Sequence, residues 1–260
     1  MGELEGKTAL IFGVANHNSI AWAIAQKLAA QGARLAFTYQ ERMEQSVRRL
    51  TADMENVLVL PCDVQNDAEL DTTFERIGQE FGGLDILVHS VAYAPTEDLR
   101  GRVSQVSRQG FQTALDISAY SLVAMARRTE PLMQARGGGS IVAMTYLGSV
   151  RVVPGYNLMG IAKAALEASI RYLAWDLGPS GIRVNGISAG PLRTLSARGV
   201  GNINDMFTLV DEVAPLRRNI TQGDVGELAS FLCTPASQNL TGNILYLDSG
   251  FQLMGLGTMG

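Results

Sequence analysis

The sequence predicts an α/β fold, in which a doubly wound parallel sheet of about seven strands carries helices on both faces. Short apolar runs alternate with longer amphipathic runs, which is the pattern of repeated βαβ units. The chain has 260 residues, of which 47% are hydrophobic and 18% charged. That length and composition suit one globular domain over residues 1–260, so we expect no internal domain boundary.

The first half of the chain alternates regularly between strands and helices. Continuous apolar runs predict strands at residues 8–12, 34–39, 57–60 and 84–89. Helical periodicity fills the intervals at residues 20–31, 41–54 and 67–81. Ser19 is placed to cap the first helix, and Gly32 is placed to end it.

The second half begins with a polar stretch at residues 95–109, which interrupts the alternation. The elements predicted beyond it are a long helix at 111–133, a strand at 140–144, a helix from about 156 to 177, and strands at 182–187 and 244–247. Residues 190–204 combine glycine, serine and arginine, and we expect this segment to act as a flap.

Composition excludes several classes of function. The net charge is −4, without the basic face that nucleic-acid binding needs. His17 and His89 are the only histidines, and they form no metal-binding pattern with Cys62 and Cys233. Both cysteines lie in apolar runs, as reduced core thiols do. With no signal peptide and no membrane-spanning run, we expect a cytoplasmic protein without nucleic-acid, membrane or metal partners.

The segment from Tyr146 to Lys163 carries the strongest chemical signal. Pro154 and Gly155 place Tyr156 at or near a helix start. Lys163 follows two turns later, about 20° around the axis and about 10 Å along it, so both side chains leave one helix face. A lysine cation favours the phenolate of a nearby tyrosine, which suits Tyr156 for proton donation. The alternative is an ordinary half-buried tyrosine and a solvated lysine, with Tyr146 serving only in packing.

Small or polar residues follow four of the predicted strands, at 13–19, 39–40, 63–64 and 90–92. Because ligands bind beyond the carboxyl ends of strands in an open parallel sheet, we expect these segments to form one rim. The first strand, loop and helix suit a pyrophosphate, although only Gly13 remains of the usual glycine pattern. Each segment also has a plain structural alternative, such as a turn glycine or a helix cap.

The end of the second predicted strand bears on the choice of dinucleotide. An acidic residue there usually holds the adenosine ribose, and this chain has Gln40, Glu41 and Arg42. With no basic pair directly at the strand end to meet a ribose phosphate, NADH is favoured over NADPH, while Arg42 leaves NADPH open. Asp63 is placed to accept a hydrogen bond from the adenine amino group.

Several spaced motifs together resemble one family. They are Gly13 followed by Ser19-Ile20-Ala21, then Cys62-Asp63-Val64, His89-Ser90, Tyr146 with Tyr156 and Lys163, Ser188-Ala189-Gly190-Pro191 with Arg193-Thr194-Leu195, and Ala214-Pro215-Leu216-Arg217-Arg218. Over essentially its whole length, the chain resembles the bacterial NADH-dependent enoyl-acyl-carrier-protein reductases, a divergent group of Rossmann-like short-chain dehydrogenases. Commoner short-chain dehydrogenases place the lysine four residues after the tyrosine, where this chain has Gly160.

The resemblance implies reduction of the trans-2 double bond of an enoyl thioester on acyl carrier protein, with NADH as hydride donor, in fatty acid elongation. It implies catalytic roles for Tyr146, Tyr156 and Lys163. It implies cofactor contacts from Gly13, Ser19, Ile20, Gln40, Asp63, Val64, Ser90, Lys163, Leu192 and Thr194. It implies an acyl site formed by Ala92, Tyr146, Tyr156, Met159, Ser196 and Met206, a substrate-binding loop around residues 190–210, and a homotetramer.

Two other functions remain open on the residues alone. A dehydrogenase acting on a ketone or alcohol would have a serine about a dozen residues before the tyrosine and a lysine four after it. The strand end here offers Met144-Thr145-Tyr146 instead. A non-catalytic dinucleotide-binding regulator is the second alternative, and loss of Tyr156 or Lys163 would favour it.

Overall fold

The computed structural model describes residues 2–99, 101–194 and 203–255, without the side chains of residues 203 and 204. Within these residues, seven strands form one sheet in the order β3-β2-β1-β4-β5-β6-β7, and every pair is parallel. The strands are β1 (Thr8–Phe12), β2 (Arg34–Tyr39), β3 (Leu58–Pro61), β4 (Ile86–His89), β5 (Gly139–Thr145), β6 (Ile182–Ala189) and β7 (Ile244–Leu247). The predicted doubly wound parallel sheet is confirmed.

The sheet changes winding direction beside β1. The chain runs outward from β1 to β3, returns to place β4 on the other side of β1, and continues outward to β7. Phe12 at the end of β1 pairs with His89 at the end of β4. The crevice between these two strand ends is the switch point, which is where ligands bind in open sheets of this kind.

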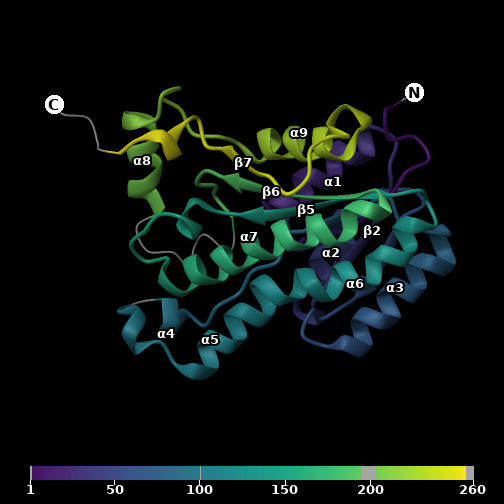
Figure 1. Ribbon diagram of the computed structural model, residues 1–260, viewed down its shortest axis with the longest axis horizontal. Coiled ribbons are helices and arrows are strands. Elements are labelled where there is room, and N and C mark those ends of the chain that lie inside the picture. The colour runs from purple at the N-terminus through teal and green to yellow at the C-terminus, as the bar shows by residue number, and fades with distance from the viewer. Residues whose placement is uncertain (1, 100, 195–202, 256–260) are drawn as a thin grey trace.

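Helices cover both faces of the sheet (Figure 1). Two large apolar clusters, one on each face, consist of residues with almost no exposed surface. On one face lie α1 (Ile20–Ala30), α2 (Glu44–Leu50) and α9 (Gln222–Cys233). On the other lie α3 (Asp67–Phe81), α6 (Ser121–Gln134) and α7 (Asn157–Leu177). Three further helices, α4 (Thr96–Leu99), α5 (Arg108–Leu115) and α8 (Ile203–Val213), lie at the end of the molecule to which the strands point.

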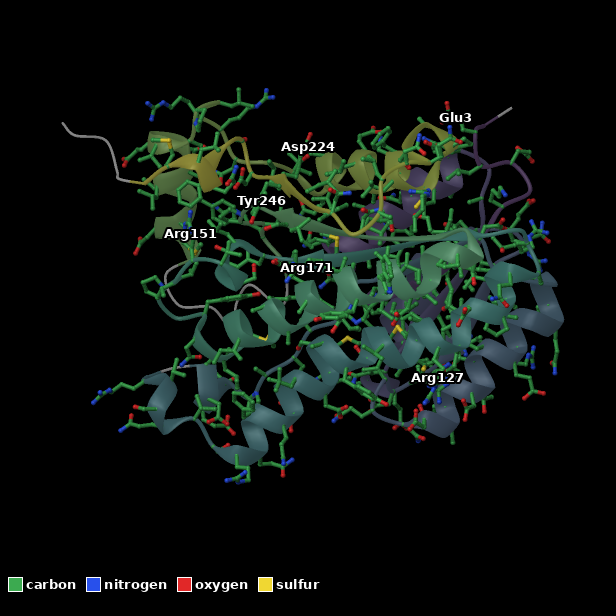
Figure 2. All side chains as sticks on the ribbon, in the orientation of Figure 1. Glu3, Arg127, Arg151, Arg171, Asp224 and Tyr246 are labelled. Atoms are coloured by element: carbon green, nitrogen blue, oxygen red, sulfur yellow. The ribbon has the colours of Figure 1, made fainter. Side chains whose placement is uncertain are left out.

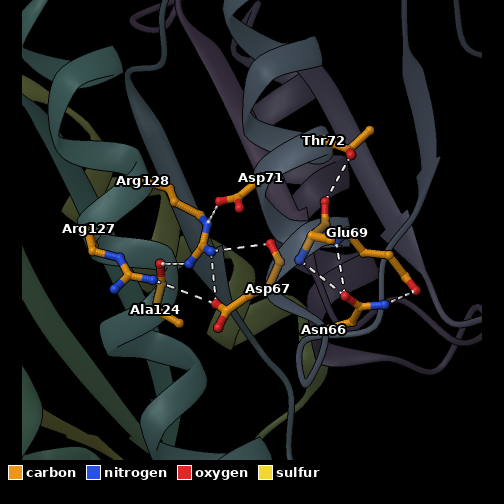
Figure 3. A network of polar contacts seen from close by, with 9 residues as sticks. Asn66, Asp67, Glu69, Asp71, Thr72, Ala124, Arg127 and Arg128 are labelled. Atoms are coloured by element: carbon orange, nitrogen blue, oxygen red, sulfur yellow. Dashed lines mark hydrogen bonds and ion pairs between the residues drawn. The ribbon is translucent and has the colours of Figure 1, made fainter.

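Polar contacts join α3 to α6 (Figure 3). The Arg128 guanidinium, whose side chain is 9% exposed, donates to Asp67 at 2.8 Å and to Asp71 at 2.6 Å. Asn66 caps α3 by accepting from the backbone N–H groups of Ala68 and Glu69. These contacts fix the start of α3, which follows β3 after residues 62–66, at the edge of the predicted nucleotide site.

The structure differs from the sequence predictions at several element boundaries. The predicted helix at 41–54 is a 3₁₀ turn, Glu41–Met43, followed by the shorter α2. The predicted helix at 111–133 begins earlier, in α5, and passes through a π-helical turn, Asp116–Tyr120, into α6. Helices α4, α8 and α9 were not predicted from the sequence.

The two cysteines are both free, which confirms the predicted reduced thiols. Burial raises the pKa of the Cys62 thiol to about 11 and that of Cys233 to about 12. Such thiols are inert rather than catalytic. The described residues contain neither a group of side chains able to hold a metal ion nor a helix long and apolar enough to cross a membrane.

Candidate active site

The predicted site residues follow the carboxyl ends of successive parallel strands or lie in α1, α7 and α8. Gly13 follows β1, Gln40 follows β2, Asp63 and Val64 follow β3, Ser90 and Ala92 follow β4, Tyr146 follows β5, and Leu192 and Thr194 follow β6. Ile20 opens α1 after Ser19, Met159 and Lys163 belong to α7, and Met206 belongs to α8. Since all these strands are parallel, the first group lies along one edge of the sheet. Ser196 lies outside the described residues.

The loop between β1 and α1 is shaped by Gly13 and Ser19. Gly13 has a φ of +103°, and a Cβ there would lie 2.1 Å from the carbonyl oxygen of Ser90, so no other residue fits. Ser19 occupies the predicted cap position of α1, but its hydroxyl accepts from the N–H groups of Ala15 and Asn16, at 3.0 Å each, and not from α1. The hydroxyl therefore folds the loop back onto the helix start.

The end of β3 is held in place by a residue that the sequence analysis missed. The Glu69 carboxylate accepts from the backbone N–H of Asp63 at 2.7 Å and from the amide of Asn66 at 2.8 Å. Asp63 itself accepts from the N–H of Gln65 at 3.0 Å, so one of its oxygens already serves a turn. The sequence signal was Asn66 followed three residues later by Glu69, which is a helix-capping pattern.

Tyr156 directly precedes α7, as predicted. Its ring packs against the 3₁₀ turn Leu147–Ser149, where a Cβ on Gly148 would lie 2.5 Å from the ring. A Cβ on Gly160 would lie 2.6 Å from the carbonyl oxygen of Gly148. Position 160 therefore has no room for the lysine that commoner short-chain dehydrogenases carry there.

The rings of Tyr146 and Tyr156 meet edge to face, with centroids 4.8 Å apart and planes 69° apart. The Tyr146 hydroxyl also contacts the sulfur of Met206 at 3.9 Å. Tyr146, which follows β5, thus contacts both Tyr156, which precedes α7, and Met206 of α8. Met159, three residues after Tyr156, lies in a small apolar cluster with Ala94, Leu99 and other residues of α4, α5 and α7.

Burial raises the pKa of both tyrosines: that of Tyr146 rises to about 12, and the Tyr156 hydroxyl is raised further above its usual range. The second contribution comes from Asp248 for Tyr146 and from Tyr146 for Tyr156. The prediction that a lysine cation favours the Tyr156 phenolate is therefore wrong for this structure, because desolvation outweighs any such effect. With its pKa raised in this way, Tyr156 keeps its proton at neutral pH.

Lys163 is 5% exposed, and its ammonium donates to the carbonyl oxygen of Met144 in β5 at 2.7 Å. Burial lowers the pKa of Lys163 to about 8, although the charge of Glu167 raises it. His89, at the end of β4, is fully buried, and its pKa falls to about 3 through burial and the charge of Lys163. Lys163 is thus a buried cation beside the strand ends and not the solvated lysine of the plain alternative.

The polar groups along this edge of the sheet suit a dinucleotide. Helix α1 starts there with no acidic residue in its first turn, which favours a pyrophosphate at its N-terminus. Gly13 brings the loop backbone close, Asp63 and Gln40 offer oxygen acceptors, and Lys163 offers a cation for ribose hydroxyls. The switch-point location, these donors and the Tyr156–Lys163 pair define an oxidoreductase of the short-chain dehydrogenase class.

Comparison with known proteins narrows that class. The family described as Enoyl-(Acyl carrier protein) reductase matches residues 13–252. The enoyl-[acyl-carrier-protein] reductase [NADH] FabI of Nostoc sp. is 51% identical, covering 98% of this chain and 100% of the relative. The NADPH enzyme of Staphylococcus aureus (strain MRSA252) is 48% identical, covering 96% and 98%. A crystal structure of the Bacillus cereus reductase with NADP+ and indole naphthyridinone superposes with a TM-score of 0.96 at 51% identity, covering 98% and 100%. The chain belongs to the enoyl-acyl-carrier-protein reductase family.

Proposed function

We propose that this protein reduces the trans-2 double bond of enoyl thioesters carried by acyl carrier protein. Family membership over residues 13–252 supports the reaction. The contact between Tyr146 and Tyr156, with Lys163 two turns further along α7, supports the location. A bound nicotinamide nucleotide supplies the hydride, which adds to the β-carbon of the acyl chain. The electron pair displaced from the double bond moves toward the thioester oxygen, where negative charge then develops. The saturated product forms when the α-carbon takes a proton from solvent and this charge returns to the carbon.

Tyr156 stabilises this developing charge by donating its hydroxyl hydrogen bond to the thioester oxygen. Its raised pKa keeps the proton on the phenol until the charge appears. Lys163 holds the nicotinamide ribose and supplies a positive field. Tyr146 and Met206 line the acyl chain together with Met159, and Ala92, exposed beyond β4, lines the same site. Residues 190–210 form the substrate-binding segment.

NADH is the proposed hydride donor in preference to NADPH. The first turn after β2 contains the acidic Glu41, and Glu44 engages Arg48 at 2.8 Å. Arg48 also donates to the Tyr39 hydroxyl at 3.0 Å, so two partners hold it. A ribose 2′-phosphate would meet the acidic Glu41 beside the basic Arg42 here, whereas ribose hydroxyls would find acceptors. Because relatives include both NADH and NADPH enzymes, the assay described below compares the two nucleotides.

The proposed protein partners are acyl carrier protein and further copies of this chain. Arg217 and Arg218 are exposed just after α8 and suit an acidic carrier protein. Tyr172 and Trp175 lie one turn apart on α7 and are 74% and 82% exposed. Large aromatic rings in such positions are typical of subunit contacts, which supports the homotetramer. Two free thiols suit the reducing cytoplasm, which is the proposed location.

The test measures NADH and NADPH oxidation with crotonyl and longer 2-enoyl thioesters of acyl carrier protein, and with ketones as the control. We expect turnover of the enoyl thioesters, with a higher kcat/KM for NADH than for NADPH. Turnover of ketones without turnover of enoyl thioesters would establish the ketone-reductase alternative. Binding of NADH without turnover of either substrate would establish the non-catalytic regulator.

A further inference from the structure

The buried carboxylate of Glu167 is a feature to which the proposed reaction assigns no task. Glu167 lies in α7, one helical turn beyond Lys163, and is 4% exposed. At about 100° per residue it returns to within about 20° of the direction of Tyr156. The tyrosine, the lysine and the glutamate therefore form one stripe on the face of α7 that lies toward the site.

Two hydroxyl groups on either side of Tyr146 donate to the same oxygen of Glu167. Thr145, the last residue of β5, donates at 2.7 Å, and Ser149, at the end of the following 3₁₀ turn, donates at 2.5 Å. The carboxylate thus anchors both ends of the segment that carries Tyr146 to α7. Because Gly148 lies in the same segment, directly against the Tyr156 ring, this anchor also sets the distance between turn and ring.

We propose that Glu167 is a positioning residue, which fixes Tyr146 and the Leu147–Ser149 turn against Tyr156 and supports the charged form of Lys163. This inference rests on the proposed roles of the two tyrosines and the lysine. In this proposal Glu167 contacts neither the substrate nor the cofactor. It acts through hydrogen bonds to Thr145 and Ser149 and through its charge along α7.

The charges around this stripe come from several elements. Burial lowers the pKa of Lys163 to about 8, and Glu167 opposes that fall. On β7, burial and then the charge of Glu167 raise the pKa of Tyr246, while Arg151 lowers it. Tyr246 and Arg151 both lie toward the end of the molecule where α8 is found (Figure 2). From β4, His89 faces Lys163 as a neutral ring, since its pKa is about 3.

Between pH 6 and pH 9, Lys163 is therefore the group among these that changes charge at the reaction centre. Tyr156 and Tyr146 keep their protons because burial raises their pKa values. Removing the negative charge of Glu167 lowers the pKa of Lys163 further, so the ammonium is lost at lower pH. If activity needs the ammonium, the loss of activity that occurs as pH rises should then begin at a lower pH than in wild type.

The experiment compares wild type, Glu167→Gln and Glu167→Leu by kcat, KM and the Kd for NADH from pH 6 to pH 9. At pH 6 Lys163 is charged, so position alone is tested: Glu167→Leu lowers kcat at least about tenfold with the Kd for NADH within about twofold. Glu167→Gln retains the hydrogen-bond acceptor and keeps kcat within about threefold at pH 6. In Glu167→Gln, the pH at which kcat/KM and NADH affinity are half lost on the alkaline side is expected to fall by at least about half a pH unit.

An unchanged kcat in Glu167→Leu at pH 6 would overturn the positioning role, and an unchanged midpoint in Glu167→Gln would overturn the charge role. If Glu167→Leu does not fold, Ser149→Ala and Thr145→Val each remove one hydrogen bond. Both are expected to lower kcat severalfold at pH 6, and normal kcat in both would refute the proposal. Failure of the proposed function itself is recognised separately, because wild type would then not reduce enoyl thioesters. The pH dependence of NADH binding still tests the link from Glu167 to Lys163.

Discussion

Tyr146 and Tyr156 meet edge to face, with ring centroids 4.8 Å apart, although one directly follows a strand and the other directly precedes a helix. Burial raises the pKa of both phenols, so both stay protonated at neutral pH. In the proposed reaction only one of them donates to the thioester oxygen. The other sets the direction of its partner and contacts Met206 in α8.

Replacing Tyr156 with Phe tests which phenol donates. The ring remains, so packing against Tyr146 and Gly148 is preserved, and only the hydroxyl is lost. We expect kcat to fall about a hundredfold and the Kd for NADH to change less than about threefold. Stopped-flow reduction and fluorescence titration measure the two quantities. Tyr146→Phe is the matched control, with a smaller expected loss of kcat.

Lys163→Met keeps the buried chain of the lysine and removes its charge. The ammonium is the proposed partner of the nicotinamide ribose, so the Kd for NADH should rise at least about tenfold. Wild type should itself bind NADH more weakly as pH rises through about 8, since the lowered pKa of Lys163 lies there. Titration from pH 6 to pH 9 measures both effects. Equal affinity of the two proteins at pH 6 would contradict the assigned role.

Gly160→Ala tests the close packing of α7 against the Leu147–Ser149 turn. The new methyl group would lie 2.6 Å from the carbonyl oxygen of Gly148, so the Leu147–Ser149 turn or α7 must shift. Because that turn carries the contact with Tyr156, we expect kcat to fall about tenfold or more. Gly178→Ala is the control, since nothing lies within 4 Å of a Cβ there. A wild-type kcat in Gly160→Ala would show that the turn moves freely.

The ends of the strands and the start of the helix after Tyr156 could be predicted from the sequence, because each depends on residues that are close together in the chain. Continuous apolar runs mark buried strands, and Pro154-Gly155 marks the start of α7. Helix α9 was missed although Thr221 and Asp224 form a capping box that the sequence displays. Two glycines weaken its helical pattern, and one of them, Gly226, is required because a Cβ would lie 2.9 Å from the carbonyl oxygen of Ala23 in α1.

The sequence indicated candidate site residues but not the electrostatics around them. The spacing of Tyr156 and Lys163 put both on one helix face, yet the direction of the Tyr156 pKa shift depends on how much water the folded chain removes. The contact between Lys163 and the Met144 carbonyl depends on the distance between α7 and β5. Glu167 was equally visible as a lone acid on an apolar helix face, but its partners come from a strand and a turn.

Asp85 gives a prediction about stability at the opposite edge of the sheet. It is 5% exposed and accepts from the N–H and hydroxyl of Thr8, from Lys7 at 2.9 Å and from Arg136 at 3.1 Å. Burial alone would raise the pKa of this carboxyl, but the hydrogen bonds from Lys7, Thr8 and Arg136 outweigh it and lower the pKa. The ionised form therefore stabilises the fold.

A folded-state pKa below the unfolded value means that this stabilisation is present above about pH 3.9 and is lost as pH falls through the folded pKa. Asp85→Asn should cost roughly 2 kcal/mol at pH 7, since Lys7 and Arg136 keep access to water and lose only a charged partner. Urea unfolding at pH 7 and pH 3 measures the difference. Because the variant has no carboxyl to protonate, the gap between the two proteins should narrow on acidification. A gap that stays constant from pH 7 to pH 3 would mean that the charge of Asp85 contributes nothing to stability.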